Sequence, residues 1–190
     1  MKKITIVAAG LLMSATSFAQ TWSIDKAHSR IGFEVTHLKI NEIDGNFKTF
    51  DAKLTSTKPD FSDATIEFTA DVNSINTDVE QRDKHLKSPD FFDAATNPNV
   101  TFKSTSFKKE KGEEYKLTGE LTMHGVTKTV TLTARLVGKT IHPMTKKEMA
   151  GFRITGSIKR SEFGIGASMP AEMISENINI VANTEFSKDN

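Results

Sequence analysis

The sequence predicts an all-β protein, an antiparallel barrel or sandwich of about eight strands with a short helical insertion near residues 78–95. Two observations carry this prediction. Apolar and polar residues alternate with a period of two through most of the chain, as in strands with one buried and one exposed face. Polar turns separate these segments at short intervals, as expected where neighbouring strands are joined by hairpins.

The strands are predicted in chain order from this alternation. In residues 30–36, one face carries Ile31, Phe33 and Val35, and the other face is polar. The run KKEKGEE at 108–114 mixes charges of both signs, so it predicts a solvated hairpin turn. Further strands are expected at 64–72, from 100 onward, at 115–123 and 130–136 around a tight His124-Gly125 turn, and at 150–158 and 178–186.

The helical insertion interrupts this rhythm. Thr77 or Asp78 can cap a short helix, because a short side-chain oxygen accepts hydrogen bonds from free amides in the first turn. Ser88-Pro89 predicts a second short turn, with serine as its cap and proline at its first position. The helix itself is indicated by the spacing of Val79, Arg82, Asp83 and Leu86, and the second turn brings Phe91 and Phe92. We expect the insertion to cover one end of a barrel.

The N-terminal residues indicate export. Two lysines precede an apolar run at 4–13, and the small residues Ser17 and Ala19 then suit a signal peptidase. The run is shorter than the roughly 20 residues of a membrane span. We therefore expect a signal peptide at 1–19 and one domain at 20–190 that is periplasmic or secreted, with no integral membrane segment.

Composition narrows the function. The chain has 25 basic and 24 acidic residues, and loss of two leader lysines changes the net charge from +1 to about −1. A near-neutral chain argues against a nucleic-acid partner. It has no cysteine, so no disulfide framework or metal-thiolate site is expected. Its five histidines are scattered singly, so the sequence predicts no metal site, although their clustering in space stays open.

The aromatic residues are unusual in kind. The chain has 13 phenylalanines but one tryptophan and one tyrosine. Phenylalanine needs no hydrogen-bond partner when buried, so these rings suit a dry lumen, although they suit an ordinary filled core equally well. An outer-membrane barrel would carry aromatic girdles at two interfaces, which one tryptophan and one tyrosine could hardly supply.

Familiar catalytic motifs are missing. The sequence has no G-x-S-x-G elbow, no H-E-x-x-H, no P-loop and no complete dinucleotide fingerprint, and GIGASM at 164–169 reads as a loop. The best candidates for a polar site are Arg82, Asp83 and His85, which combine a donor, an acid and a titratable base. A surface salt bridge with an exposed histidine remains the alternative reading of these three residues.

Several motifs together resemble the YceI-like family. They are W-S-I-D-x-A-H-S-x-I-x-F from Trp22, T-H-L from Thr36, D-G-x-F from Asp44, R-D-x-H-L from Arg82, F-F-D from Phe91, L-T-x-H-G-V-T-K from Leu121 and R-S-E-F-G from Arg160. They span nearly the whole chain after the leader. The resemblance implies a lipocalin-like, extended antiparallel β-barrel, usually periplasmic, that holds a long isoprenoid or other lipid tail, such as a polyprenyl or quinone-type molecule.

The resemblance also implies a carrier or storage protein, with the bound lipid as its only ligand and no further cofactor. Our alternation count assigns the lumen to Phe33, Val35, Phe47, Phe68, Phe102, Met123 and Phe152. At the ends we expect Phe91 and Phe92 to cap or line the tunnel, Met169 and Met173 to form an adaptable rim loop, and His37, Arg82, Asp83 and His85 to stand at the rim near a headgroup.

Other functions remain open at this stage. The first is an enzyme acting on a lipid or a stress product, with His85 as base and Asp83 orienting it. The second is a module that sequesters an amphiphilic compound or binds a partner through its rim. Carriage, storage and stress protection are all compatible with the leading interpretation, and so is a homodimer.

Overall fold

The computed structural model describes residues 18–189, so most of the expected signal peptide lies outside the described residues. Among them, no helix is long and apolar enough to cross a membrane. The helical elements are η1 (Val72–Ser74), α1 (Glu80–Leu86) and η2 (Arg160–Phe163). The strands are β1 (Gln20–Ile24), β2 (Arg30–His37), β3 (Asn41–Phe47), β4 (Phe50–Ser56), β5 (Thr65–Asp71), β6 (Ile75–Asn76), β7 (Asn99–Lys109), β8 (Glu114–Met123), β9 (Val126–Ile141), β10 (Glu148–Lys159) and β11 (Ile174–Lys188).

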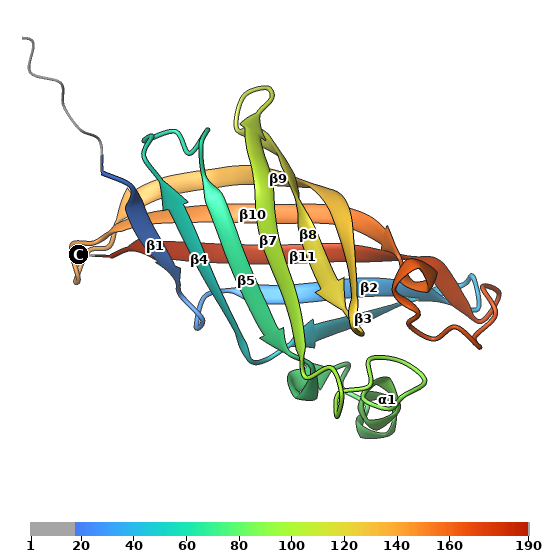
Figure 1. Ribbon diagram of the computed structural model, residues 1–190. Coiled ribbons are helices and arrows are strands. Elements are labelled where there is room, and N and C mark those ends of the chain that lie inside the picture. The colour runs from blue at the N-terminus through green and yellow to red at the C-terminus, as the bar shows by residue number, and fades with distance from the viewer. Residues whose placement is uncertain (1–17, 190) are drawn as a thin grey trace, which may run out of the picture.

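The strands close into an antiparallel barrel (Figure 1). The ring runs β1-β4-β5-β7-β8-β9-β10-β11 and returns to β1, which gives eight strands within the described part of the chain. The remaining strands continue members of this ring: β2 follows β1 along β11, β3 precedes β4, and β6 extends the line of β5. The predicted barrel of about eight strands is therefore confirmed, and three of its strands are interrupted.

At the end of the barrel near β1, an aromatic cluster is formed by Trp22, Phe61, Phe107, Tyr115, Phe152 and Phe186. Tyr115 stacks on Phe107 with ring centroids 4.8 Å apart, and Phe61 meets the edge of Phe152 at 5.4 Å. The Tyr115 hydroxyl donates a 2.6 Å hydrogen bond to the carbonyl of Asp60, which satisfies its polar tip. These rings fill the lumen and close this end.

Phe152 lies at a different level of the barrel from the one that the sequence predicts. Its alternation predicts a lumen residue, and it does face inward, but it packs among the rings of the closed end and does not line the cavity described below. Alternation reports which face of a strand a residue occupies, but it does not report the height of that residue along the barrel axis.

The loop between β4 and β5 covers the closed end and is held by Asp63. Its carboxylate accepts hydrogen bonds from the Ser56 hydroxyl at 2.6 Å and from the amide of Lys58 at 3.2 Å, and Thr57 donates both its amide and its hydroxyl. Burial raises the pKa of Asp63, but these donors outweigh burial and hold that pKa well below its ordinary value of 3.8. The ionised carboxylate therefore fixes the loop.

The helical insertion is confirmed, but its expected caps are wrong. The helix α1 begins after Val79, which makes no side-chain cap bond, and Asp78 has a left-handed backbone with φ of 60°. Thr77 instead donates its amide and hydroxyl to Asp83. Ser88 begins a turn rather than a helix, closed by hydrogen bonds from the amides of Phe91 and Asp93 to its carbonyl.

Candidate functional site: an apolar cavity in the barrel

An internal cavity of about 420 Å³ occupies the barrel between the closed end and the helical insertion. This volume lies in the range of small-molecule binding pockets, about 300–1,000 Å³. Its walls come from every strand of the ring and from α1. Beyond the predicted residues, the walls include Ile24, Ile31, Ile43, Ile66, Leu117, Leu121, Leu132, Ile154, Ile158, Ile165, Ile174, Ile178 and Ile180.

Most of the predicted site residues lie on this cavity. The lining contains Phe33, Val35, Phe47, Phe68, Phe91, Phe92, Phe102, Met123, Met169 and Met173, together with His37, Arg82 and His85. Phe152 and Asp83 do not line it. The structure thus brings side chains from positions 33 to 173 together around one cavity.

Two glycines make room for the rings on the wall. Phe33 faces Gly45 on the neighbouring strand, and a Cβ added to Gly45 would lie 2.1 Å from the Phe33 ring. Phe102 is similar, because a Cβ on Gly119 would lie 2.4 Å from its ring. Each ring tip therefore covers a glycine on the wall, and this packing leaves the middle of the barrel hollow.

The helical insertion partly closes the cavity at the end opposite the aromatic cluster. Phe91 and Phe92 are buried, and the ring of Phe92 meets Phe47 edge to face at 6.2 Å. The ring of Phe91 contacts His85 at 4.8 Å, and a Cβ on Gly166 would come within 2.9 Å of it. Phe91 and Phe92 thus give the half-charged insertion an apolar side toward the barrel, with Arg82 and His85 beside them on the cavity wall.

A polar cluster of Arg82, Thr77 and Asp83 borders the cavity. Arg82 Nε donates to the Thr77 hydroxyl at 2.7 Å, and Arg82 Nη2 donates to the Thr77 carbonyl at 2.7 Å. The Thr77 hydroxyl donates in turn to Asp83 Oδ1 at 2.6 Å. Within residues 18–189, Arg82 Nη1 has no hydrogen bond and no carboxylate lies within 4.0 Å of the guanidinium. Arg82 can therefore offer donors to an anionic or hydroxyl headgroup.

The arrangement expected for an enzyme is absent from this cluster. Asp83 binds Thr77 rather than His85, and the carboxylate nearest His85 belongs to Asp90, with 3.6 Å between Nε2 and Oδ2. His85 and Asp90 are both largely exposed. The prediction that Asp83 orients His85 is therefore wrong, because the Thr77 hydroxyl and amide hold that carboxylate on the other side of the helix.

Arg160 is a wall residue that the sequence did not single out. It is 4% exposed and donates to the carbonyls of Ser175, Ile165, Gly166, Met169 and Ile174. All five N–H groups of a guanidinium can be satisfied in this way. Arg160 thus organises the loop from η2 to β11, and three of the residues whose carbonyls it binds, Ile165, Met169 and Ile174, line the cavity.

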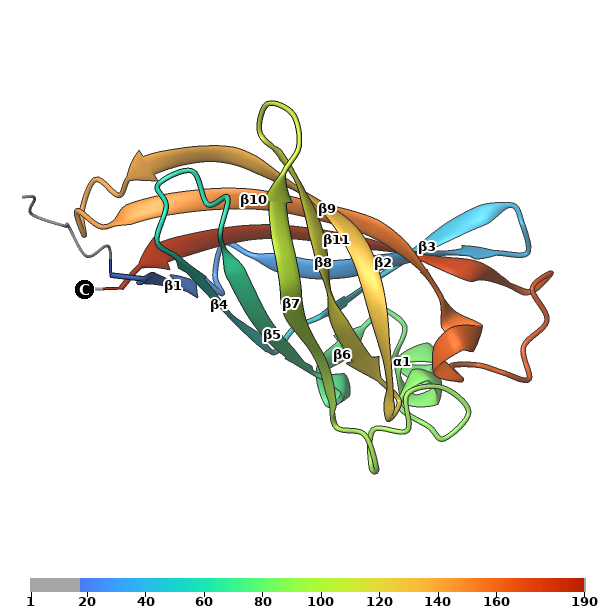
Figure 2. The same cartoon turned by 45° about the horizontal axis from the view of Figure 1, so that its top comes forward.

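The cavity opens where its lining residues reach the surface. His37, His85 and Met173 line the cavity and are also exposed. They come from the end of β2, from α1 and from the loop before β11, which gather at one end of the barrel in both views (Figures 1 and 2). The mouth therefore lies between these three segments, opposite the aromatic end.

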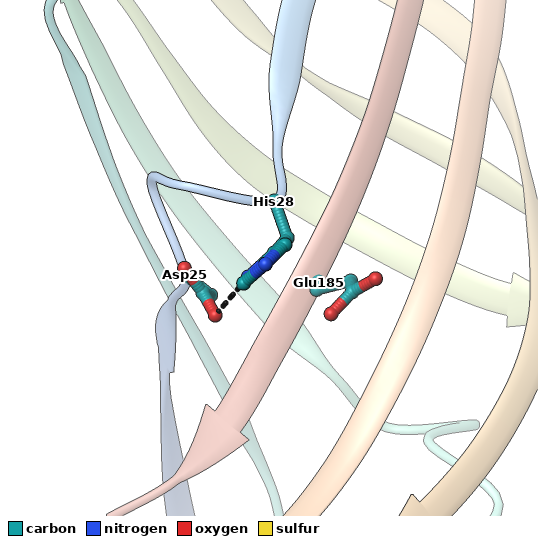
Figure 3. A group of neighbouring side chains, drawn as sticks. All are labelled: Asp25, His28 and Glu185. Atoms are coloured by element: carbon teal, nitrogen blue, oxygen red, sulfur yellow. Dashed lines mark hydrogen bonds and ion pairs between the residues drawn. The ribbon is translucent and has the colours of Figure 1, made fainter.

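A separate group of titratable side chains stands outside the cavity (Figure 3). Ligand atoms of Asp25, His28 and Glu185 all lie within 4.8 Å of one another. His28 Nδ1 lies 2.8 Å from Asp25 Oδ2, and this hydrogen bond raises the pKa of His28 and lowers the pKa of Asp25. The Asp25 amide also donates to the Glu185 carbonyl at 2.8 Å.

These three residues could hold a metal ion, but the hydrogen bonds that they make join the loop between β1 and β2 to β11. The loop lies where β11 passes from its pairing with β2 to its pairing with β1, so these bonds fix the connection between β1 and β2. The sequence pattern did not indicate this group, because Glu185 is far from Asp25 and His28 along the chain.

Comparison with known proteins agrees with this geometry. The family model of the YceI-like domain matches residues 22–186. The Protein YceI of Salmonella newport is 40% identical over 161 residues, which cover 84% of this chain and 83% of that relative. The crystal structure of the Campylobacter jejuni YCEI protein has a TM-score of 0.75 and 32% identity, with 100% of both chains covered.

A second structure shows the same fold at lower sequence identity. It is a polyisoprenoid binding domain from Saccharophagus degradans, with a TM-score of 0.64 and 16% identity over 88% of this chain and 98% of that one. The family match and the Salmonella relative cover most of the sequence. The chain belongs to the YceI-like family.

Proposed function

We propose that this protein binds a long isoprenoid or quinone-like lipid, with the hydrocarbon tail in the barrel cavity. The size and chemistry of the cavity carry the proposal. The wall of the empty cavity is apolar over almost its whole area, and apolar surface left in contact with water costs about 25 cal/mol per Å². A tail that fills this space removes the cost.

The affinity would come from burial of the tail. Each methylene transferred from water contributes about 0.8 kcal/mol, so several isoprene units suffice for tight binding before the cost of ordering the chain. The similar barrel from Saccharophagus degradans is described as binding polyisoprenoid, which supports this class of ligand. Cavity length would then select tail length.

The headgroup would meet Arg82 at the mouth. Its Nη1 is free of partners in the described chain, and the other two nitrogens are fixed by Thr77. A fixed guanidinium with spare donors suits a phosphate, a carboxylate or a quinone oxygen. Lipid selection would therefore combine a long apolar tail with an acceptor at its head.

We place this activity in the periplasm, as carriage, storage or stress protection of the lipid. The leader pattern at 1–19 supports export. A binding role is favoured over catalysis because the Asp90 carboxylate beside His85 is exposed and 3.6 Å away, and because the two hydroxyls on the cavity wall, of Thr77 and Thr184, already donate to Asp83 and to the Phe152 carbonyl.

The first test extracts protein purified from its native cells with organic solvent and identifies the extract by mass spectrometry. We expect a long-chain prenyl species near one per protein. Delipidated protein is then titrated with a fluorescent prenyl probe, and we expect saturable uptake. Folded protein that yields no lipid and takes up no probe would refute the proposal.

A further inference from the structure

The mouth of the cavity is bordered by exposed apolar side chains. Leu38 is 48% exposed and Ile40 is 84% exposed, both at the tip of the β2–β3 hairpin, and Met173 on the loop before β11 is 46% exposed. We call these three residues the rim patch. His37, next to Leu38 in the chain, lines the cavity, as does Met173 itself. The patch is therefore continuous with the apolar interior.

One backbone hydrogen bond and one ion pair join the two segments of the rim patch. The amide of Leu38 donates to the carbonyl of Met173 at 3.0 Å. Lys39 Nζ lies 3.7 Å from Glu172 Oε1, so the charge at the hairpin tip already has a partner. Figure 2 shows the hairpin and the loop side by side at the open end. The two segments present one apolar surface with little net charge.

The hairpin tip keeps this surface in a strained backbone. Leu38 and Lys39 have φ of 51° and 61°, and the amide of Ile40 donates to the carbonyl of His37 at 3.1 Å, which makes a type I′ turn. Asn-Gly is the favoured pair for such a turn, and leucine is disfavoured there. A half-exposed leucine at this position does not stabilise the fold. An apolar contact with a binding partner would explain why a leucine occupies the turn.

We propose that the rim patch docks on the surface of a phospholipid bilayer and inserts Leu38, Ile40 and Met173 among the acyl chains. The cavity mouth then opens against the membrane, and a lipid tail passes between bilayer and barrel without crossing water. This inference rests on the proposed lipid-binding function. It adds the surface through which the cargo enters and leaves.

The size of the patch favours a bilayer over a protein partner. A stable dimer buries about 800 Å² on each partner. Three side chains on two loop tips supply much less, while shallow insertion into a bilayer needs only a few large apolar residues. Because Lys39 is paired with Glu172, the contact depends on apolar insertion and should be nearly insensitive to salt.

The test is flotation of the full protein with vesicles of phosphatidylethanolamine and phosphatidylglycerol. The variant Leu38→Asn/Ile40→Thr removes two apolar side chains and places asparagine where the turn favours it, so the fold is retained or stabilised. We expect its partitioning onto vesicles to fall about tenfold. The matched control is Ile141→Thr/Met144→Thr at the opposite end, where these side chains are 63% and 83% exposed. The control should float like the wild type.

Each result decides the matter. Equal flotation of the two double variants, or no flotation of the wild type, would overturn the docking proposal. If the wild type does not float but still takes up a prenyl probe, lipid binding stands without docking. If it floats but takes up no probe, the proposed function fails instead. A concentration-dependent dimer that Leu38→Asn/Ile40→Thr abolishes would identify a second copy as the occupant and overturn the bilayer proposal.

Discussion

Replacement of Arg160 by glutamine should destabilise the protein severely. The guanidinium is 4% exposed and satisfies five backbone carbonyls of the loop from η2 to β11. A buried acceptor left without a donor costs about 1–3 kcal/mol, but loop carbonyls near the mouth can regain water. We therefore expect a net loss of about 3–5 kcal/mol in the free energy of unfolding, a large part of the stability of a typical domain.

Urea unfolding followed by circular dichroism measures this loss. In a separate thermal melt, the melting temperature should fall by about 6–20 °C, given about 2–4 °C per kcal/mol for a chain of this size. Arg153→Gln on the outer face of β10 is the control, since that exposed side chain should change stability by about 0.5 kcal/mol at most. Arg160→Lys should recover little, because an ammonium has three donors and no planar fork. An Arg160→Gln variant as stable as the control would refute this reasoning.

Three further predictions concern the wall, the closed end and the mouth. Gly45→Ala forces the ring of Phe33 into the lumen, so the variant should fold but have a shorter cavity. Relative to the wild type, its affinity for long prenyl probes should fall at least several-fold more than its affinity for short ones. An unchanged ratio of the two affinities would show that the ring does not limit the cavity. The depressed pKa of Asp63 means that its ionised form stabilises the folded state at pH above about 4, and this stability is lost as pH falls below that value. Asp63→Asn should therefore be less stable at neutral pH and show a flatter acid limb in pH-dependent melting; an acid limb equal to wild type would contradict the assignment. Arg82→Gln should weaken binding of a prenyl phosphate about tenfold more than that of a prenyl hydrocarbon in probe competition, since it removes a cation at the mouth; equal losses would rule out the headgroup contact.

The barrel was predictable because its signal is local. Period-two alternation marks each strand separately, and the ring of eight follows from strands joined by short turns. The breaks between β1 and β2 and between β3 and β4 were not predictable, since each follows from a change of partner along a neighbouring strand. Alternation also does not report height along the barrel axis, so Phe152 is expected beside the cavity but lies among the rings of the closed end.

The polar side chains of the site were harder to predict. Arg82 and His85 stand out in the sequence because charges cluster around them, and the structure places both on the cavity. Arg160 also has charged neighbours in the sequence, but its burial arises because the carbonyls of the following loop surround its guanidinium. A partner that is a backbone carbonyl leaves no mark in composition, so this residue could be recognised only in three dimensions.

The two ends of the barrel stabilise a hollow middle. At one end the rings around Phe61 and Tyr115 and the loop held by Asp63 form a filled core, and at the other end Arg160 fixes the loop beside the mouth. The proposed lipid tail would supply most of the contacts that the wall between them lacks. Changes at the ends should therefore lower the melting temperature equally with and without lipid. Changes on the wall, such as Phe68→Ala, should chiefly reduce the rise in melting temperature that added lipid produces, because a ligand stabilises the folded state in proportion to RT ln(1 + [L]/Kd).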